Sequence, residues 1–441
     1  MLKCAFYERE ITPPLGSHLP GYANIRKANE VNDRLMAKAC VFSNGDDTIA
    51  MIAIDSLHME NEFRNEIAKR VNHYTQIPEK NVLVAAVHTH TGIPMWKSTC
   101  DDEQVNDAQE HYFDVFAKLI ADCAIIAYKR LEETDMVFGV GNVEGISFCR
   151  NYYMKDQDPR TNPPRLSPDI IGPVSPTDNE LPVLFARAKD GTALGALVCF
   201  ACHLDCVGGI AFSGDYASEL SKKLKAVYGE NFVTVFFIGT AGDINHFNVH
   251  VAEDAPDHYR MMGRKLADEV IKNVALAQPV EGNMVKSHYE QIQIPRREIS
   301  KEVLDYARHI VDTVQEEKGI KIAADGTNKE QYELMMSKKL LWFLETSPEI
   351  YDIVLQYMQI GDVHFFGFPS EIYCRFGMDL KARMDDSKCI VATCCNATYG
   401  YVPTRDLFYE SIYSSRAGSS RLHSEAGYIM VEKLLEMCKQ G

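Results

Sequence analysis

The sequence lacks any apolar run long enough to cross a membrane, and it lacks a secretory leader. No stretch of the 441 residues approaches the length of a spanning helix. The opening residues, MLKCAFYERE, contain neither an apolar central segment nor a small-residue cleavage site. We therefore expect a cytoplasmic protein that makes no integral contact with a membrane.

Positive charge is scarce and is not clustered. Lysine and arginine together number 46 against 62 aspartates and glutamates, which gives a formal net charge of −16. A nucleic-acid backbone or an anionic lipid surface needs clustered basic side chains, so neither is an expected partner. A small molecule or a neutral amide is the better expectation. The sequence leaves the oligomeric state open, a homodimer included.

Regular cysteine spacing is also missing. The 13 cysteines form an odd number without a repeated C-x-x-C pair. Without an export signal they are expected to be reduced and mostly buried thiols, which excludes a disulfide framework. The same spacing argues against a zinc ribbon.

What the chain does contain is an alternation of short apolar segments with amphipathic ones. Apolar residues make up 46% and charged residues 24%, as in soluble globular proteins. The alternation predicts an α/β fold (mixed α+β), with mixed β-sheets flanked by helices. Strands are expected over residues 36–44, 48–55, 82–87, 181–188, 195–202, 233–239, 363–369 and 389–395. Helices are expected over residues 60–74, 109–132, 217–228, 258–276, 371–384 and 424–439.

Two longer stretches interrupt this pattern. Residues 156–179 are rich in proline and turn formers, which predicts a long ordered loop. Residues 301–347 are charged and have a helical pattern. We therefore expect a single domain over residues 1–441 with a helical insertion at about 299–348.

Side chains that can bind a metal or transfer a proton follow the predicted strands. In α/β folds, ligands bind beyond the carboxyl ends of strands, where loops converge on a rigid sheet. Five strands are followed by such residues: His88 with His90, His203 with Asp205, Asp243 with Asn245 and His246, Glu371 at a predicted helix start, and Tyr399 with Tyr401. One shared site is therefore expected.

The H-T-H stretch at His88 and His90 favours a zinc site. Histidine and glutamate are usual ligands of catalytic zinc, which keeps one position for water. On an extended chain both histidines point to the same side, because strand side chains alternate with a period of two. The alternative is that each histidine only caps a strand end. The presence of Glu371 in the same set favours the metal.

A series of motifs resembles the neutral, non-lysosomal ceramidases. Near the start, REITPPLGSHLPGYA is similar to the opening of that family, and VHTHTG is similar to its H-T-H-S-G. The stretches CRNYYMKDQDPRTNPP, FACHLDCVGG, FSGDYAS, GTAGDINHFN, GFPSE and YGYVPT follow in the order of the family. The similarity runs in register from about Glu10 to about Ser420.

The resemblance implies a catalytic domain that holds one zinc ion per chain and hydrolyses the amide of ceramide. His88 and His203 would be the imidazole ligands and Glu371 the carboxylate ligand. Tyr401 would be the phenol ligand, with Tyr399 as a reserve or as a contact to the substrate.

The same resemblance assigns roles around the metal. His90 would donate a proton or stabilise an oxyanion, and Arg150 would bind a polar or anionic part of the substrate. The residues themselves add two expectations that do not come from the resemblance. Gly208, with Gly209, would let the backbone approach the substrate closely. Met95 and Trp96 would line the entrance, unless they belong to the core.

Three departures separate this sequence from the family. The family motif G-D-x-S-P-N is Gly242-Asp243-Ile244-Asn245-His246-Phe247 here, so an asparagine stands in place of a serine that the family uses. The C-terminal β-sandwich domain and the secretory signal of the ceramidases are also expected to be missing. The departures favour a substrate more soluble than ceramide, and none of them removes a metal ligand.

We therefore predict a zinc-dependent hydrolase that cleaves an amide (N-acyl) bond of a small molecule with metal-activated water. A direct attack needs no serine, and the amide of Asn245 would hydrogen-bond the substrate or the oxyanion. Asp243, with Asp205 as a second option, would orient a histidine, unless Asp243 only caps a turn. Two alternatives stay open: a zinc esterase or lactonase, and a ceramidase-fold binding protein that has lost turnover.

Overall fold

The structure is a computed structural model that describes residues 1–22, 26–93, 103–317, 320, 322, 328–385 and 387–440. The side chains of residues 103–111 and 114 are outside this description. Met95 and Trp96, for which the sequence predicts a place at the entrance or in the core, lie outside the described residues.

The larger of two main sheets is nine-stranded and mixed. Its order is β16 (Val233–Ile238), β14 (Ala193–Phe200), β13 (Glu180–Ala188), β8 (Glu132–Asn142), β1 (Lys3–Glu10), β5 (Met36–Ser43), β6 (Thr48–Ile54) and β7 (Val82–Ala86), with β18 (Gln278–Pro279) paired to β8. The pairs β14–β16 and β6–β7 are parallel, and the other pairs are antiparallel. The mixed α/β architecture predicted from the sequence is thus present.

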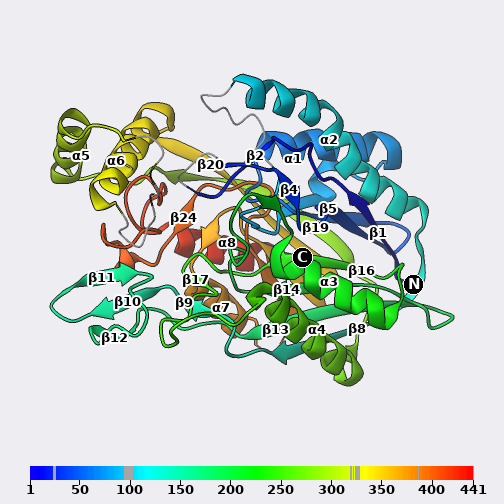
Figure 1. Cartoon of the computed structure of the whole chain (residues 1–441). Coiled ribbons are helices and arrows are strands. Elements are labelled where there is room, and N and C mark those ends of the chain that lie inside the picture. The colour runs from blue at the N-terminus through cyan, green and yellow to red at the C-terminus, as the bar shows by residue number, and fades with distance from the viewer. Residues whose placement is uncertain are drawn as a thin grey trace.

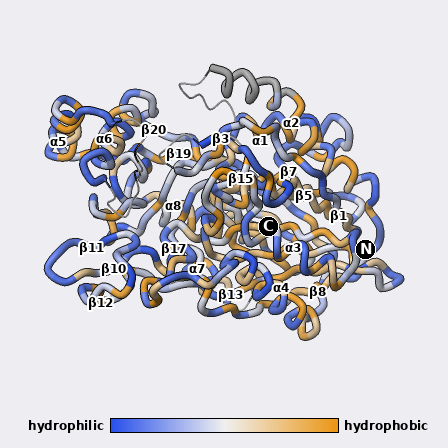
Figure 2. The backbone as a smooth tube through the Cα atoms, in the orientation of Figure 1, coloured by the Kyte–Doolittle hydropathy of each residue, from blue (hydrophilic) through white to orange (hydrophobic). Residues whose placement is uncertain are grey.

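Strands β5 to β7 are buried on both faces, which explains why their sequences are mostly apolar, with Lys38 as an exception in β5. On one face, Val41 and its neighbours pack against Phe63 of α1 (Asn61–Thr75) and Phe116 of α2 (Glu103–Lys129). On the other face, Phe42 and Met51 belong to the main core. Each such side chain stabilises the fold by about 1.5–3 kcal/mol. Figure 2 shows hydrophobic residues, in orange, spread through the interior of the molecule, while much of its outline is hydrophilic.

The second main sheet has four strands in the order β19 (Val285–Pro295), β20 (Ile350–Ile360), β21 (Val363–Gly367) and β23 (Cys389–Ala392). Only the pair β21–β23 is parallel. The segment after β23 joins it to the larger sheet, since Thr393 N–H donates to Ile238 (2.9 Å) and Asn396 N–H donates to Val84 (2.7 Å).

Helices cover the outer faces of this strand assembly (Figure 1). α3 (Asp215–Tyr228) packs on β16, and α4 (His258–Leu276) packs on β8 and β13. α7 (Cys374–Arg383) lies against β23 and α8 (Ala426–Lys439) against β20. None of the helices in the described ranges is both long and apolar enough to span a bilayer.

The carboxyl ends of strands from both ends of the larger sheet meet. Although β7 and β16 end the strand order, β16 packs against β5, β6 and β7, so the sheet folds back on itself. A parallel bridge between Thr89 and Leu204 links the segments that follow β7 and β14. An antiparallel bridge between Ala85 and Cys395 brings in the segment after β23. The predicted convergence of strand ends follows from this arrangement.

Short paired strands build the loops around this meeting point. They are β2 (His18–Leu19) with β3 (Arg26–Lys27), β4 (Glu30–Val31) with β15 (Ala211–Phe212), β9 (Phe148–Cys149) with β17 (Ile244–Asn245), and β22 (Glu371–Ile372) with β24 (Tyr401–Val402). Single 3-10 turns occupy Glu79–Asn81 and Arg405–Leu407.

Two local predictions were wrong. Glu371 does not open a helix: it lies in β22, and α7 begins at Cys374. Residues 156–179 are not one loop, because β11 (Gln157–Thr161) and β12 (Ile170–Pro173) flank β10 (Asn151–Met154) in a small sheet. Two prolines of this stretch, Pro159 in β11 and Pro173 in β12, lie on edge strands, where a missing N–H breaks no inner ladder.

The charged stretch for which the sequence predicts a helical insertion connects β19 to β20. It contains α5 (Lys301–Thr313) and α6 (Lys329–Thr346), which pack on each other at one side of the molecule (Figure 1). The Ser300 hydroxyl caps α5 by accepting a hydrogen bond from the N–H of Val303.

Candidate metal centre

The two histidines after β7 do not lie on an extended chain. β7 ends at Ala86, and His88 has a φ of 73°, in the left-handed region that non-glycine residues rarely adopt. Its N–H donates to the carbonyl of Ser56 (2.9 Å), which helps to hold this conformation. The alternation argument for His88 and His90 was therefore wrong, although the centroids of their rings still lie 5.2 Å apart. Strain of this kind is common at functional sites.

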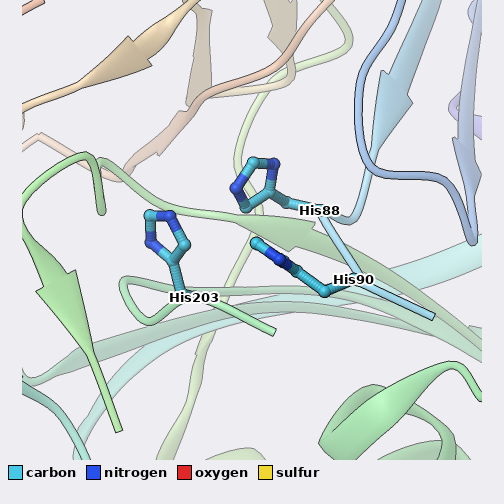
Figure 3. Close-up of side chains that lie close together, drawn as sticks. All are labelled: His88, His90 and His203. Atoms are coloured by element: carbon cyan, nitrogen blue, oxygen red, sulfur yellow. The ribbon is translucent and has the colours of Figure 1, made fainter. Parts of the chain in front are cut away.

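His203 reaches the same point from the loop after β14. Its ring centroid lies 4.6 Å from that of His88 and 5.9 Å from that of His90. Figure 3 shows the three rings directed toward one another from two separate segments of the chain. Each offers a ring nitrogen, and these nitrogens lie within 4.8 Å of one another.

The hydrogen bonds of the rings define which nitrogen faces inward. Nδ1 of His88 lies 2.7 Å from the carbonyl of Leu57, and Nδ1 of His203 lies 2.9 Å from that of Ile244. A carbonyl oxygen only accepts, so each Nδ1 carries a hydrogen and each Nε2 is the nitrogen left to bind a metal. This is the arrangement that protein metal sites use to orient histidine ligands.

Glu371 completes the group from β22. Its Oε2 lies 3.2 Å from Nε2 of His88 and 3.4 Å from Nε2 of His203, and all three side chains are buried. Its Oε1 lies 3.2 Å from Nε2 of His58. We call His58, His88, His203 and Glu371 the buried cluster. Within it, His58 fixes one carboxylate oxygen and leaves the other to face the two rings.

Charge in the buried cluster is balanced around the carboxylate. Burial opposes a charge on His88, but Glu371 outweighs it and raises the pKa of His88 well above its usual range. Burial would raise the pKa of Glu371, but His88 and its neighbours lower it well below the usual range. Burial and Arg150 lower the pKa of His203. The buried carboxylate of Glu371 is therefore stabilised by a positive charge beside it. A divalent cation would provide this charge in place of the proton on His88.

The atoms of the buried cluster fit such a cation. Nε2 of His88 and Oε2 of Glu371 are buried atoms that make no hydrogen bond of normal geometry within the described residues. Their separation of 3.2 Å is close to the ~3.3 Å between neighbouring ligands of a tetrahedral zinc with bonds of about 2.0–2.1 Å. Two imidazoles and a carboxylate are also a donor set that zinc accepts. The buried cluster could thus hold a metal ion.

Tyr401 and Arg150 border the buried cluster. The ring of Tyr401 stacks on that of His203 with a centroid distance of 6.4 Å. The guanidinium carbon of Arg150 lies 4.9 Å from the centroid of the Tyr401 ring, and its Nη1 lies 3.4 Å from Nε2 of His203. Burial and the nearby Glu371 raise the pKa of Tyr401 well above its usual range, so the phenol keeps its proton.

His90 stands beside the buried cluster and is held from the other side. Its Nδ1 lies 3.1 Å from the carbonyl of Gly21, and its Nε2 is a buried atom without a hydrogen-bond partner among the described residues. Burial lowers the pKa of His90 well below its usual range, so the ring is neutral with its lone pair on Nε2. A neutral ring with this tautomer accepts a proton before it can donate one.

Of the two candidate tyrosines, only Tyr401 is at the buried cluster. The hydroxyl of Tyr399 donates to the carbonyl of Asp352 (2.8 Å), and its ring contacts Tyr351. Gly400 lies between the two tyrosines with a φ of 87°, which breaks the strand alternation and turns Tyr399 away. The reserve role as a metal ligand does not agree with this position, and the contact of Tyr399 with a substrate stays a prediction.

Asp243 makes other contacts than predicted. Its Oδ1 accepts from the N–H of Cys374 (2.7 Å) and so caps the start of α7. The Nδ1 atoms of His88 and His203 are held by backbone carbonyls, so Asp243 does not orient either ring. The structure agrees with the capping alternative, with α7 rather than a local turn as the capped element.

Asp205 does lie beside a histidine. Its Oδ1 is 3.5 Å from Nε2 of His246, outside the buried cluster. Burial would raise the pKa of Asp205, but His246, His203 and His90 lower it to about 2. An ionised carboxylate therefore lies between the buried cluster and His246.

Asn245 and Gly208 are placed without a direct contact to the buried cluster. Nδ2 of Asn245 donates to the side-chain oxygen of Asn162 (3.2 Å), and its Oδ1 accepts from the N–H of Phe247 (3.0 Å). Gly208 lies in an exposed loop near Tyr22. Their proposed contacts with a substrate stay predictions.

Sequence reasoning missed His58. The signal was present, since His58 follows the apolar run of β6 as His88 follows that of β7. It stands four residues beyond the strand rather than two, and no motif of the resemblance contains it.

Comparisons with known proteins place the fold and the family of the chain. No curated protein sequence matches the chain. Its fold is similar to that of the neutral ceramidase from Pseudomonas aeruginosa, with a TM-score of 0.72 and 18% identity over 99% of this chain and 74% of that one. A ceramidase complexed with C2 gives a TM-score of 0.71 and 17% identity with the same coverage. The family described as neutral/alkaline non-lysosomal ceramidase, N-terminal, matches residues 8–250, more than half of the sequence. The chain therefore belongs to the neutral/alkaline non-lysosomal ceramidase family.

Proposed function

We propose that this chain is a zinc-dependent hydrolase of an amide bond in a small N-acyl substrate. The observation that carries the proposal is the convergence of two buried imidazoles on one buried carboxylate oxygen. Nε2 of His88 lies 3.2 Å and Nε2 of His203 lies 3.4 Å from Oε2 of Glu371. Membership of the ceramidase family supports the choice of an amide bond. The net charge of −16 and the departure at Asn245 support a substrate more soluble than ceramide.

The residues that would hold the ion are His88, His203 and Glu371, with Tyr401 as the neighbouring phenol. Zinc, when bound, makes a water molecule more acidic and polarises a carbonyl group. His58 keeps the carboxylate of Glu371 in place through its contact of 3.2 Å, so the donor set is ordered before the substrate arrives.

His90 is the proposed proton carrier. Its Nδ1–H is used by the carbonyl of Gly21, so its Nε2 first accepts a proton from the attacking water. The resulting imidazolium then donates this proton to the leaving amine nitrogen. The sequence predicts only that His90 donates a proton. In this proposal it accepts that proton first.

Arg150 is proposed to stabilise negative charge on the carbonyl oxygen of the substrate. It is buried, and one of its nitrogens lies 3.4 Å from His203. A fixed positive charge at this point would stabilise an oxyanion without reorganisation. If the substrate carries a carboxylate, the guanidinium of Arg150 could bind that group instead.

A binding protein that has lost turnover is the second candidate. The observation in its favour is that Asn245, in place of the family serine, has its amide engaged by Asn162 and Phe247 and offers no nucleophile. A zinc esterase or lactonase would use the same residues. The cytoplasmic location, the homodimer and the lack of nucleic-acid and membrane partners stay predictions.

Metal analysis with matched substrates tests the proposal. The purified chain is analysed for zinc and then assayed on an amide and an ester with the same acyl group. We expect bound zinc and amide hydrolysis in the wild type, and loss of both in His88→Ala and Glu371→Gln. His73→Ala, an exposed histidine in α1, is the matched control and should change neither.

Each other result selects another function. Full zinc occupancy in both variants would show that His88 and Glu371 are not zinc ligands. Cleavage of the ester alone would favour the esterase, and bound zinc without turnover on either substrate would favour the binding protein.

A further inference from the structure

A second group of metal-binding side chains lies outside the buried cluster. Cys206, His246 and His258 each offer a donor atom, and these atoms lie within 4.8 Å of one another. Cys206 comes from the loop after β14, His246 follows β17, and His258 is the first residue of α4. We call these three residues the outer cluster. None of the predicted metal ligands belongs to it.

His246 is oriented as a metal ligand would be. Its Nε2 lies 3.5 Å from Oδ1 of Asp205, which is a charge contact and not a hydrogen bond, and its Nδ1 is a buried atom without a hydrogen-bond partner in the described residues. A carboxylate behind a histidine is the usual support for a metal-binding ring, because it fixes the ring and makes its other nitrogen more basic.

The ring of His258 lies against the backbone of His246 without a well-formed hydrogen bond. Both of its ring nitrogens are buried atoms that make no hydrogen bond of normal geometry to any described residue. Its ring centroid lies 5.1 Å from that of His246. Buried imidazole nitrogens without partners cost free energy, which a bound cation would recover.

The sulfur atoms determine which ion fits. Sγ of Cys206 lies 3.4 Å from Sδ of Met262, one turn after His258 on α4. A thiolate and two imidazoles, with a thioether nearby, are soft to borderline donors. Such a set selects zinc or copper over magnesium, calcium or manganese.

We propose that Cys206, His246 and His258 form a second metal site that binds one zinc or copper ion. The site is independent of the proposed hydrolase function, since it shares no ligand with the buried cluster. His246 stands in the six-residue motif at the position where the family has proline, so the stretch that lacks the family serine supplies a new ligand.

The number of ions per chain is the first test. The full chain is purified with a reductant, loaded with zinc or with copper, desalted and analysed for metal. We expect two ions per chain in the wild type. Cys206→Ser and His258→Ala should each lose one ion, and Glu371→Gln should lose the other. His250→Ala and Cys438→Ser are controls that should keep both, because neither residue belongs to a cluster.

A cobalt-loaded sample separates the two sites without relying on the count. A cysteine is among the donors of the outer cluster alone, whereas the Cys394 thiol near the buried cluster lies 3.8 Å from Nδ1 of His88, the nitrogen that Leu57 holds. We therefore expect a thiolate-to-cobalt charge-transfer band in the wild type and in Glu371→Gln. The band should disappear in Cys206→Ser. Copper loading that gives an intense visible thiolate band would assign copper, and stoichiometric zinc without copper uptake would assign zinc.

Two results would overturn the proposal. One is a wild-type chain that takes up a single ion and shows no thiolate band with cobalt, which needs no variant to fold. The other is a Cys206→Ser chain that keeps two ions and an unchanged cobalt spectrum.

Discussion

The buried cluster and the outer cluster are two neighbouring groups of histidines that differ in their partners. The buried cluster is organised around Glu371, which two rings and His58 approach within 3.4 Å. The outer cluster has no carboxylate among its three donors, and Asp205 stands behind His246 instead. A carboxylate with imidazoles suits catalytic zinc, whereas a thiolate with imidazoles suits softer ions. Donor chemistry, more than spacing, therefore distinguishes the two groups.

The two clusters also differ in how firmly the surrounding structure holds their side chains. The buried cluster lies where the loops after β6, β7 and β14 meet β22, and its ring Nδ1 atoms are held by backbone carbonyls. The outer cluster includes the first residue of α4 and half-buried side chains. We expect the buried cluster to be the more rigid and the more selective of the two.

The largest effect should follow from removing a ligand of the buried cluster. His203→Ala removes one imidazole ligand while Glu371 stays buried. We expect the free energy of zinc binding to weaken by about 4 kcal/mol, which corresponds to roughly a thousand-fold loss of zinc affinity. Competition with a chromophoric chelator measures this change. The ion of the outer cluster should stay bound with its wild-type affinity, and a parallel loss of both ions would show that the two clusters form one unit.

A smaller effect should follow from removing the residue behind each ligand. His58→Ala should weaken zinc binding at the buried cluster by about ten- to hundred-fold, because Glu371 loses the partner of one oxygen. Asp205→Asn should weaken binding at the outer cluster by a similar factor. Each variant serves as the control for the other in the same titration. Crossed effects would contradict the separation of the clusters.

The fold could be predicted from the sequence where strands are buried on both faces. The runs at β5, β6, β7 and β16 are mostly apolar, and their positions were found. Strands β1, β8, β19 and β20 were missed, because charged and polar residues on their exposed positions interrupt the apolar pattern. These four strands pair mostly with antiparallel neighbours, and their partners, more than their own sequences, reveal them.

Residues of the site were predicted from the sequence where a motif marks them. They were missed where their position depends on the backbone geometry of distant segments. His88, His203 and Glu371 follow strands and carry motifs, so the sequence brought them together. The positive φ of His88 and the role of His58 depend on contacts with distant segments, which no local pattern contains. The outer cluster joins the loop after β14, the segment after β17 and the start of α4, and no local pattern predicted that these would meet.

Gly21→Ala should lower turnover while both clusters keep their ions. Gly21 has a φ of 103°, and a Cβ there would stand 2.6 Å from Nδ1 of His90. The ring must move, so we expect about a ten-fold lower kcat, with ~1–2 kcal/mol of lost stability from the backbone. Gly16→Ala is the matched control, since Gly16 has a φ of 96° with open space around its Cβ position. An equal loss of kcat in both variants would assign the effect to backbone strain alone.

The smallest effect should come from Tyr399→Phe. Its hydroxyl donates to the carbonyl of Asp352, so the change should cost about 1 kcal/mol of unfolding free energy and leave kcat/KM within about two-fold. Tyr401→Phe removes a phenol next to Glu371 and should lower kcat/KM by about ten-fold or more. Urea unfolding and initial rates on the same two preparations separate these effects. If Tyr399→Phe lost as much activity as Tyr401→Phe, the left-handed Gly400 would not isolate Tyr399 from the reaction, and the phenol of the buried cluster would need a new assignment.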